Sequence, residues 1–152
     1  MSKHIILDST PLGLLTTPTT NTEVLAITEW TKACLNAGHR IYIPEIIDYE
    51  LRRELIRAGK QNSRTLLDVA KASFWYIAIT TDAMLYAADL WAHSRNSGQP
   101  TGSPLKLDID VILAAQALTV QIPVGDDIVV ATDNVGHLSR FVHADLWSNI
   151  AP

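Results

Sequence analysis

The sequence predicts an α/β protein, a three-layer α/β/α fold around a mostly parallel sheet of about four to five strands. Short β-branched apolar runs alternate with longer segments of helical periodicity along the 152 residues. Strands separated by helices favour parallel pairing with both faces of the sheet covered. Neither a repeat nor a linker divides the chain, and its length suits one core. Residues 1–152 are therefore expected to form a single domain.

Each predicted element follows from a local pattern. Strands are predicted at five places, which are His4–Leu7, Arg40–Ile43, Ser73–Thr80, Asp126–Thr132 and the extended segment near Ala144–Trp147. The run Ser73–Thr80 is the most β-favouring and is expected to be a central strand. Helices are predicted at about 21–37, 45–59, 62–72, 82–98 and 107–120, with a short one around 138. The STPLG segment after Asp8 is interpreted as a turn, and Gln99–Pro104 as a loop.

Composition excludes several classes of protein. A hydrophobic fraction of 47% and a charged fraction of 18% indicate an ordered globular chain. No apolar run approaches the roughly 20 residues of a membrane-spanning helix, and the N-terminus lacks a signal-peptide core, so a cytoplasmic protein is expected. The single Cys34 rules out an intrachain disulfide and a cysteine-rich zinc site. The net charge of −4 argues mildly against nucleic-acid binding, unless metal ions neutralise an acidic centre.

Acidic residues recur where a parallel α/β sheet places its functional groups. Two predicted strands end at Asp8 and Asp133, and ligands of such sheets gather at the carboxyl ends of the strands. Glu50 and Asp110 lie in two predicted helices. Carboxylates brought together repel one another unless a hard cation such as Mg²⁺ or Mn²⁺ neutralises them. Such an ion can activate water for phosphodiester hydrolysis.

Each acid also has a structural interpretation. Asp8 and Asp133 could form turns after their strands. Glu50 could be a solvated helix residue, and Asp110 could interact with the N-terminal dipole of its helix. The order and context of the four acids favour a shared site over four unrelated roles.

Four motifs make the chain resemble the PIN-domain family, and in particular the VapC-type toxin ribonucleases and their free-standing bacterial relatives. The motifs are IILDST, YELRREL, DVILAAQAL and VVATDNVGHLSRF, and they run from position 4 to about 141. The resemblance implies a metal-dependent endoribonuclease whose catalytic acids are Asp8, Glu50, Asp110 and Asp133. It also implies that Asp8, Asp110 and Asp133 hold Mg²⁺ or Mn²⁺. An RNA substrate, an antitoxin protein and a homodimer are partners that the resemblance suggests.

Five further residues are secondary candidates, namely Asp108, Ser9, Thr10, Thr132 and Asn134. The hydroxyls and the amide could orient the acids or a metal-bound water. Residues two apart on a helix do not share a face, so Asp110 is preferred over Asp108 as the direct ligand.

Two other functions remain open. The first is a PIN fold kept as a protein-binding module, with acids too displaced to cleave RNA. The second is a haloacid dehalogenase-like phosphohydrolase, which would need a second Asp where this chain has Thr10. Histidines 137 and 143 are not assigned to a site.

Overall fold

The structure is a computed structural model, and it describes residues 1–98 and 103–152. The strands are β1 (Lys3–Leu7), β2 (Arg40–Pro44), β3 (Trp75–Ile77), β4 (Asp127–Ala131) and β5 (Ala144–Asp145). The helices are α1 (Ser9–Leu15), α2 (Thr22–Asn36), α3 (Glu45–Arg57), α4 (Gln61–Ser73), α5 (Thr81–Asn96), α6 (Pro104–Thr119) and α7 (Val135–Leu138), with a 3-10 helix, η1 (Trp147–Asn149). Most of the loop predicted at 99–104 lies outside the described residues.

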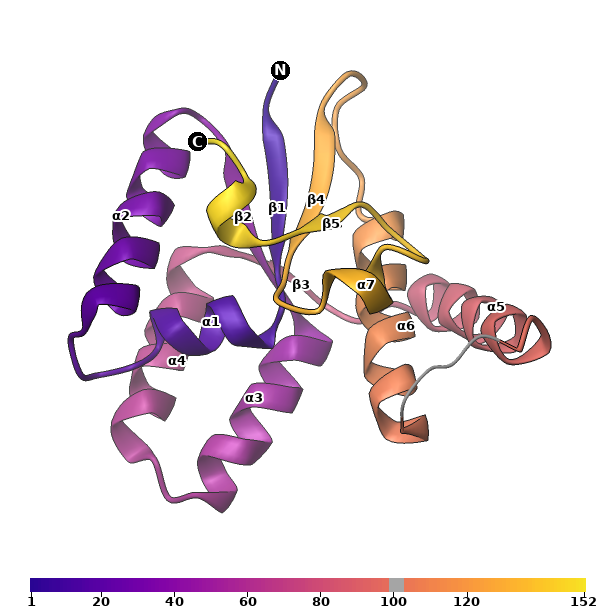
Figure 1. Ribbon diagram of the computed structural model, residues 1–152, viewed down its shortest axis with the longest axis horizontal. Coiled ribbons are helices and arrows are strands. Elements are labelled where there is room, and N and C mark those ends of the chain that lie inside the picture. Colours follow the sequence, from indigo (N-terminus) through magenta and orange to yellow (C-terminus); the bar gives the residue numbers. More distant parts are fainter. Residues whose placement is uncertain (99–102) are drawn as a thin grey trace.

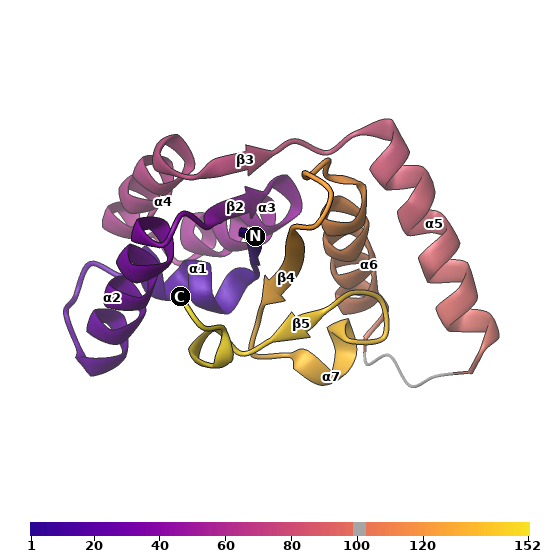
Figure 2. The ribbon, with the colours of Figure 1, turned by 90° about the horizontal axis from the view of Figure 1, so that it is seen from above.

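The five strands form one sheet in the order β3-β2-β1-β4-β5, and every pairing is parallel. Helix α2 lies on one side of this sheet and α6 on the other (Figures 1 and 2). Helix α5 packs against α6 on the side away from the strands (Figure 2). The predicted α/β class, with a parallel sheet between helical layers, is confirmed.

The centre of the sheet forms the main core. Ile5, Ile6 and Leu7 of β1 are fully buried, and Val130 and Ala131 of β4 are equally buried beside them. Strands covered on both faces consist of continuous apolar residues, which explains why these runs do not alternate with polar ones. Burial of Ile5–Leu7 fixes the register in which Leu7 pairs with Ala131, so both strands end at the same level.

The prediction of a central strand at Ser73–Thr80 is wrong. Only Trp75–Ile77 is extended within the sheet, and β3 is an edge strand beyond β2. Trp75 is 54% exposed, with the Arg40 guanidinium 4.5 Å from the centre of its ring. β-propensity measures how well a residue fits a pleated surface and does not say where in the sheet the strand lies. The chain then leaves the sheet, because the Ile79 N–H donates to Glu45 and the Thr80 hydroxyl caps α5.

The turn predicted after Asp8 is also wrong, because Ser9–Leu15 forms α1. Asp8 is the N-cap of this helix, and its carboxylate accepts a hydrogen bond from the Ser9 N–H. Pro11 lies within the first turn, where the lack of an N–H costs nothing, so the proline does not break the helix. The Asp-Ser-Thr-Pro segment therefore begins a helix that also fixes the conformation of Asp8.

No helix in the described part of the chain is long and apolar enough to cross a membrane. The longest helices, α5 and α6, have 16 residues each.

Candidate active site

The ends of β1 and β4 place Asp8 beside Thr132. The Asp8 N–H donates to the Ala131 carbonyl at 3.0 Å, which continues the ladder by one residue. The Thr132 hydroxyl donates to Asp8 Oδ2 at 2.7 Å, and the Ser9 N–H donates to Oδ1 at 2.7 Å. The Asn134 N–H in turn donates to Thr132 Oγ1 at 2.8 Å. Asp8 is 2% exposed, and each of its oxygens is held by one donor.

Asp110 approaches from α6 and is 1% exposed. Neither of its carboxylate oxygens accepts a hydrogen bond from the residues that the structure describes. Two basic side chains lie near it, Lys106, whose Nζ is 3.5 Å from Oδ1, and His137, whose Nδ1 is 3.7 Å from Oδ2. Both distances are too long for well-formed hydrogen bonds. A buried carboxylate without donors is unusual and calls for an explanation such as a bound ion.

The environment of Asp110 raises the pKa of its carboxyl group. Burial is the main cause, because it disfavours the charged form. The Lys106 ammonium opposes this rise, while the carboxylate of Asp8 adds to it. The influence of Asp8 on this pKa shows that the two acids, from β1 and α6, share one electrostatic environment.

Glu50 joins the cluster from α3. Its Oε1 is buried without a hydrogen-bond partner, and its Oε2 lies 3.9 Å from Lys106 Nζ. Lys106 therefore lies within ion-pair distance of both Glu50 and Asp110. Burial alone would lower the pKa of the Lys106 ammonium, but the charges of these two acids and of Asp8 raise it. The ammonium offsets part of the negative charge of Glu50 and Asp110.

Of the other predicted site residues, Ser9, Thr132 and Asn134 belong to the hydrogen-bond network of Asp8, whereas Asp133, Thr10 and Asp108 lie on the surface. Asp133 and Thr10 are exposed, and neither side chain has a hydrogen bond or ion pair within the described residues. Asp108 is exposed and lines a hollow of about 380 Å³ between α5 and α6, together with Met84 and Trp91. The structure thus brings Asp8, Glu50 and Asp110 together. It leaves Asp108 and Asp133 on the surface.

Lys106 and His137 are parts of the site to which sequence reasoning gave no role. Lys106 could have been found, because it lies four residues before Asp110 and i,i+4 neighbours meet on a helix. The sequence places His137 within the VVATDNVGHLSRF motif, but nothing in that motif indicates that it lies beside Asp110. Its position opposite Asp110 depends on how α7 packs against α6.

A hard divalent cation fits the donor chemistry of this cluster. Asp110 offers two buried oxygens without hydrogen bonds, and Glu50 offers a third. Oxygen ligands of this kind are those that Mg²⁺ and Mn²⁺ prefer. In their present arrangement, however, residues 1–98 and 103–152 contain no group of three acidic, histidine or cysteine side chains that could hold a metal ion.

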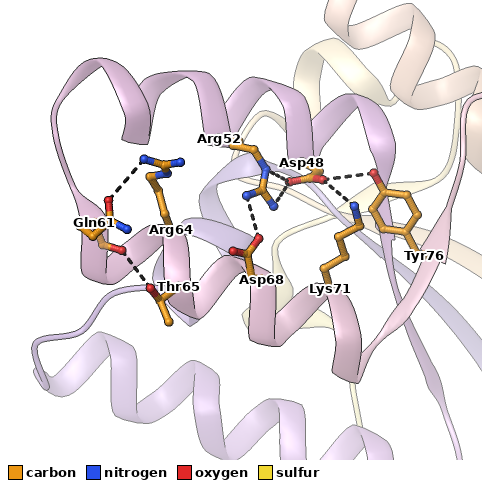
Figure 3. Close-up of polar contacts among 8 residues, drawn as sticks. All are labelled: Asp48, Arg52, Gln61, Arg64, Thr65, Asp68, Lys71 and Tyr76. Atoms are coloured by element: carbon orange, nitrogen blue, oxygen red, sulfur yellow. Dashed lines mark hydrogen bonds and ion pairs between the residues drawn. The ribbon is translucent and has the colours of Figure 1, made fainter.

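A second buried acid, Asp48 on α3, has a different environment (Figure 3). The Arg52 Nε and one terminal nitrogen of its guanidinium each lie 3.0 Å from Asp48 Oδ1, and the Tyr76 hydroxyl donates to Oδ2 at 3.1 Å. Lys71 Nζ lies 3.8 Å from Oδ2. Arg52 also donates to Asp68 at 2.8 Å, which ties α3 to α4. Every oxygen of Asp48 has a hydrogen bond, so this cluster is structural.

Comparison with known proteins supports the fold but does not test the chemistry of the site. No family model matches the chain, and no curated protein matches its sequence. A chain of VapBC2 from Rickettsia felis, in a complex bound to a DNA fragment from the promoter, matches with a TM-score of 0.70. The sequence identity is 16%, and the match covers 94% of this chain and 98% of that one.

Two further solved structures show the same likeness. FitAcB from Neisseria gonorrhoeae matches with a TM-score of 0.65 and 17% identity, over 96% of this chain and 99% of its own. VapBC-1 from nontypeable Haemophilus influenzae matches with a TM-score of 0.61 and 16% identity, over 95% and 98%. The chain therefore has the PIN-type fold that its motifs predicted. The particular likeness is to VapBC and FitAcB chains.

Proposed function

We propose that this chain is a divalent-metal-dependent endoribonuclease of the PIN type. One observation carries the proposal. The buried carboxylate of Asp110 has no hydrogen bond and lies in the same cluster as Asp8 and Glu50. An unsatisfied buried carboxylate destabilises a fold, so a function that uses its free oxygens accounts for it best.

In this proposal Asp8 and Asp110 would hold Mg²⁺ or Mn²⁺ together with Asp133, which lies exposed just after β4, and Glu50 would complete the acidic centre. A bound ion supplies a water of lowered pKa and stabilises charge on the phosphate that is attacked. The Thr132 hydroxyl donates a hydrogen bond to Asp8, and its oxygen accepts one from the Asn134 N–H. Asp8 is thereby kept in one orientation, with lone pairs left for an ion.

The test is cleavage of RNA by the purified chain with Mn²⁺ or Mg²⁺. Asp110→Asn should lower the rate at least about 100-fold, since it removes a ligand charge from the centre. Asp89→Asn is the matched control, because Asp89 is an exposed acid on α5, far along the chain from the acidic motifs. Equal cleavage by wild type and Asp110→Asn would assign the activity to a contaminant or another site, and would refute the proposal.

A protein partner is the second part of the proposal. Helix α5 exposes large apolar side chains, including Leu85 at 63% and Met84 at 43%. Exposed apolar surface of this kind marks an interface. An antitoxin, as in a toxin–antitoxin pair, or a second copy of the chain would cover it. Light scattering of the purified chain distinguishes a monomer of 16.7 kDa from a dimer, and loss of a dimer in Leu85→Glu would place the interface on α5.

The alternative is a PIN fold that binds a partner without cleaving RNA. The ion pairs of Lys106 with Asp110 and Glu50 favour it, since an internal cation already offsets part of the acidic charge. The discriminating measurement is Mn²⁺ binding by the metal-free chain. A chain that binds no Mn²⁺ but still forms an oligomer or binds a partner protein would support this alternative.

A further inference from the structure

A polar hollow lies between two connecting segments of the chain, away from the acidic cluster. Its volume is about 500 Å³, and residues 17–19 and 59–63 line it. These residues belong to the segment that joins α1 to α2, the segment that joins α3 to α4, and the first turn of α4. The lining contains no acid and one lysine, Lys60. Its composition therefore suits a negatively charged ligand.

Helix α4 begins at this hollow without a cap (Figure 3 labels its first residue, Gln61). The N-cap residue is Lys60, whose side chain only donates, and the first turn contains no acid. The N–H groups of Asn62 and Ser63 have no acceptor among the residues that the structure describes. Free N–H groups and the partial positive charge of a helix N-terminus together favour a bound anion.

The side chain of Ser63 is a second, independent sign of a ligand. Ser63 is only 8% exposed, and its hydroxyl has no hydrogen bond within the described part of the chain. The other two hydroxyls of α4 bond back to helix carbonyls, Thr65 to Gln61 at 3.2 Å and Ser73 to Val69 at 2.7 Å. The Ser63 oxygen is not enclosed by protein atoms, so it opens into the hollow. A largely buried hydroxyl without a partner is costly unless something in the hollow bonds to it.

Lys60 brings a positive charge to the same place. Its ammonium forms no ion pair with any residue that the structure describes. Its charge does reach Glu54, where the hydrogen bond from Arg57 lowers the pKa of the carboxyl group and Lys60 lowers it further. Glu54 is already bound by Arg57, so the ammonium remains available to a ligand.

We propose that this hollow binds a phosphate group, held by the N–H groups of Asn62 and Ser63, the Ser63 hydroxyl and the Lys60 ammonium. A phosphate offers several acceptor oxygens and a negative charge, which match these donors. Inorganic phosphate and the backbone of an RNA strand both carry this chemistry, and only the RNA source rests on the proposed function. The helix between Glu50 and Arg57 is about 10 Å long, so an RNA strand of several nucleotides is long enough to reach both sites.

Amide NMR spectra of the isotope-labelled chain in a chelator test the proposal with two probes, inorganic phosphate and a short single-stranded RNA. Potassium chloride of equal ionic strength is the reference. Phosphate should shift the Asn62 and Ser63 N–H resonances until they saturate. Ser63→Ala should weaken phosphate binding at least about tenfold, because it removes a hydrogen bond to a charged group. Ser73→Ala removes a hydroxyl at the other end of the same helix and should bind phosphate as wild type does.

Lys60→Asp separates loss of the site from loss of the fold. An aspartate at the N-cap accepts from the N–H groups that the phosphate would otherwise take. The variant should therefore have a higher Tm than wild type without phosphate, yet bind no phosphate. Lys32→Asp makes the same change of charge at an exposed position on α2 and should bind phosphate as wild type does.

The two probes identify the source of the phosphate. Weaker RNA binding in both Ser63→Ala and Lys60→Asp would assign the site to the RNA backbone. Loss of inorganic phosphate with unchanged RNA binding would assign it to free phosphate. Amide resonances that move with neither probe, or variants that bind both probes as wild type does, would overturn the proposal. The test needs neither metal nor cleavage, so a chain that cleaves no RNA would contradict the proposed function and leave the phosphate site standing.

Discussion

Asp48 and Asp110 are both acids buried on helices, at 6% and 1% exposure, yet their surroundings differ in kind. Asp48 receives hydrogen bonds on both oxygens, from Arg52 and Tyr76. Asp110 receives none and has only long contacts with Lys106 and His137. Burial and an acidic side chain therefore do not distinguish a structural acid from a candidate metal ligand. The satisfaction of the carboxylate oxygens is what distinguishes them.

The electrostatic effects of the two acids on their neighbours support this distinction. Burial and the charge of Asp48 raise the pKa of the Tyr76 hydroxyl, so it remains a protonated donor to the carboxylate. Burial would lower the pKa of Arg52, but its contacts with Asp68 and Asp48 raise it. The groups around Asp48 stay in the protonation states that bond to it. Around Asp110, no donor among residues 1–98 and 103–152 is close enough to do the same.

The largest expected effect concerns metal-dependent stability. Mn²⁺ at about 100 times its Kd should raise the free energy of unfolding by about 2.7 kcal/mol, in wild type and in Asp48→Asn alike. Asp110→Asn should show no such rise at the same concentration, because it lacks a ligand charge. Urea denaturation with Mn²⁺ and with a chelator measures both. A rise in Asp110→Asn equal to that of wild type would erase the proposed difference between the two acids.

The next effect concerns stability without metal. Asp48→Ala should lower the free energy of unfolding by about 1–2 kcal/mol, because it removes charge-assisted hydrogen bonds from Arg52 and Tyr76. The loss is moderate, since the Arg52 side chain is 26% exposed and can turn to water and Asp68. Asp68→Ala is the control, because it removes only the exposed end of the network. A larger loss from Asp68→Ala than from Asp48→Ala would contradict the assignment of Asp48 as the structural centre.

Much of the fold follows from local sequence, and the exceptions have physical reasons. The buried runs of β1 and β4 were predicted because both faces of a central strand are apolar. The segment Ser73–Thr80 looked central because its residues favour extended structure, but Glu45 and the cap of α5 draw its second half out of the sheet. Such competition comes from tertiary contacts that no local pattern records.

The candidate site likewise contains residues that local sequence predicts and residues that depend on tertiary contacts. Asp8 could be predicted from the end of its strand, and Asp110 from the spacing and motif of its helix. Lys106 could be predicted from the i,i+4 rule, had the helix been searched for cations as well as acids. His137 depends on the packing of α7, and the exposure of Asp133 depends on how the chain turns after β4. The two acids predicted at strand ends therefore differ, because Asp8 is fixed by hydrogen bonds after β1, whereas Asp133 lies exposed after β4.

The smallest expected effect is the pH dependence that Asp110 contributes to the metal-free protein. Because its pKa is raised in the folded state, the folded chain binds this proton more tightly than the unfolded chain does. The contribution of Asp110 to stability should therefore fall as the pH rises from its ordinary pKa of 3.8 to its raised value, and stay constant above it. Asp110→Asn lacks this titration, so its stability relative to wild type should rise over the same window. Urea denaturation in a chelator at several pH values measures that difference, with Asp89→Asn, at an exposed acid on α5, as the control. A difference between wild type and Asp110→Asn that does not vary with pH would mean that Asp110 is as well solvated or as well paired as Asp48, and the contrast between the two acids would disappear.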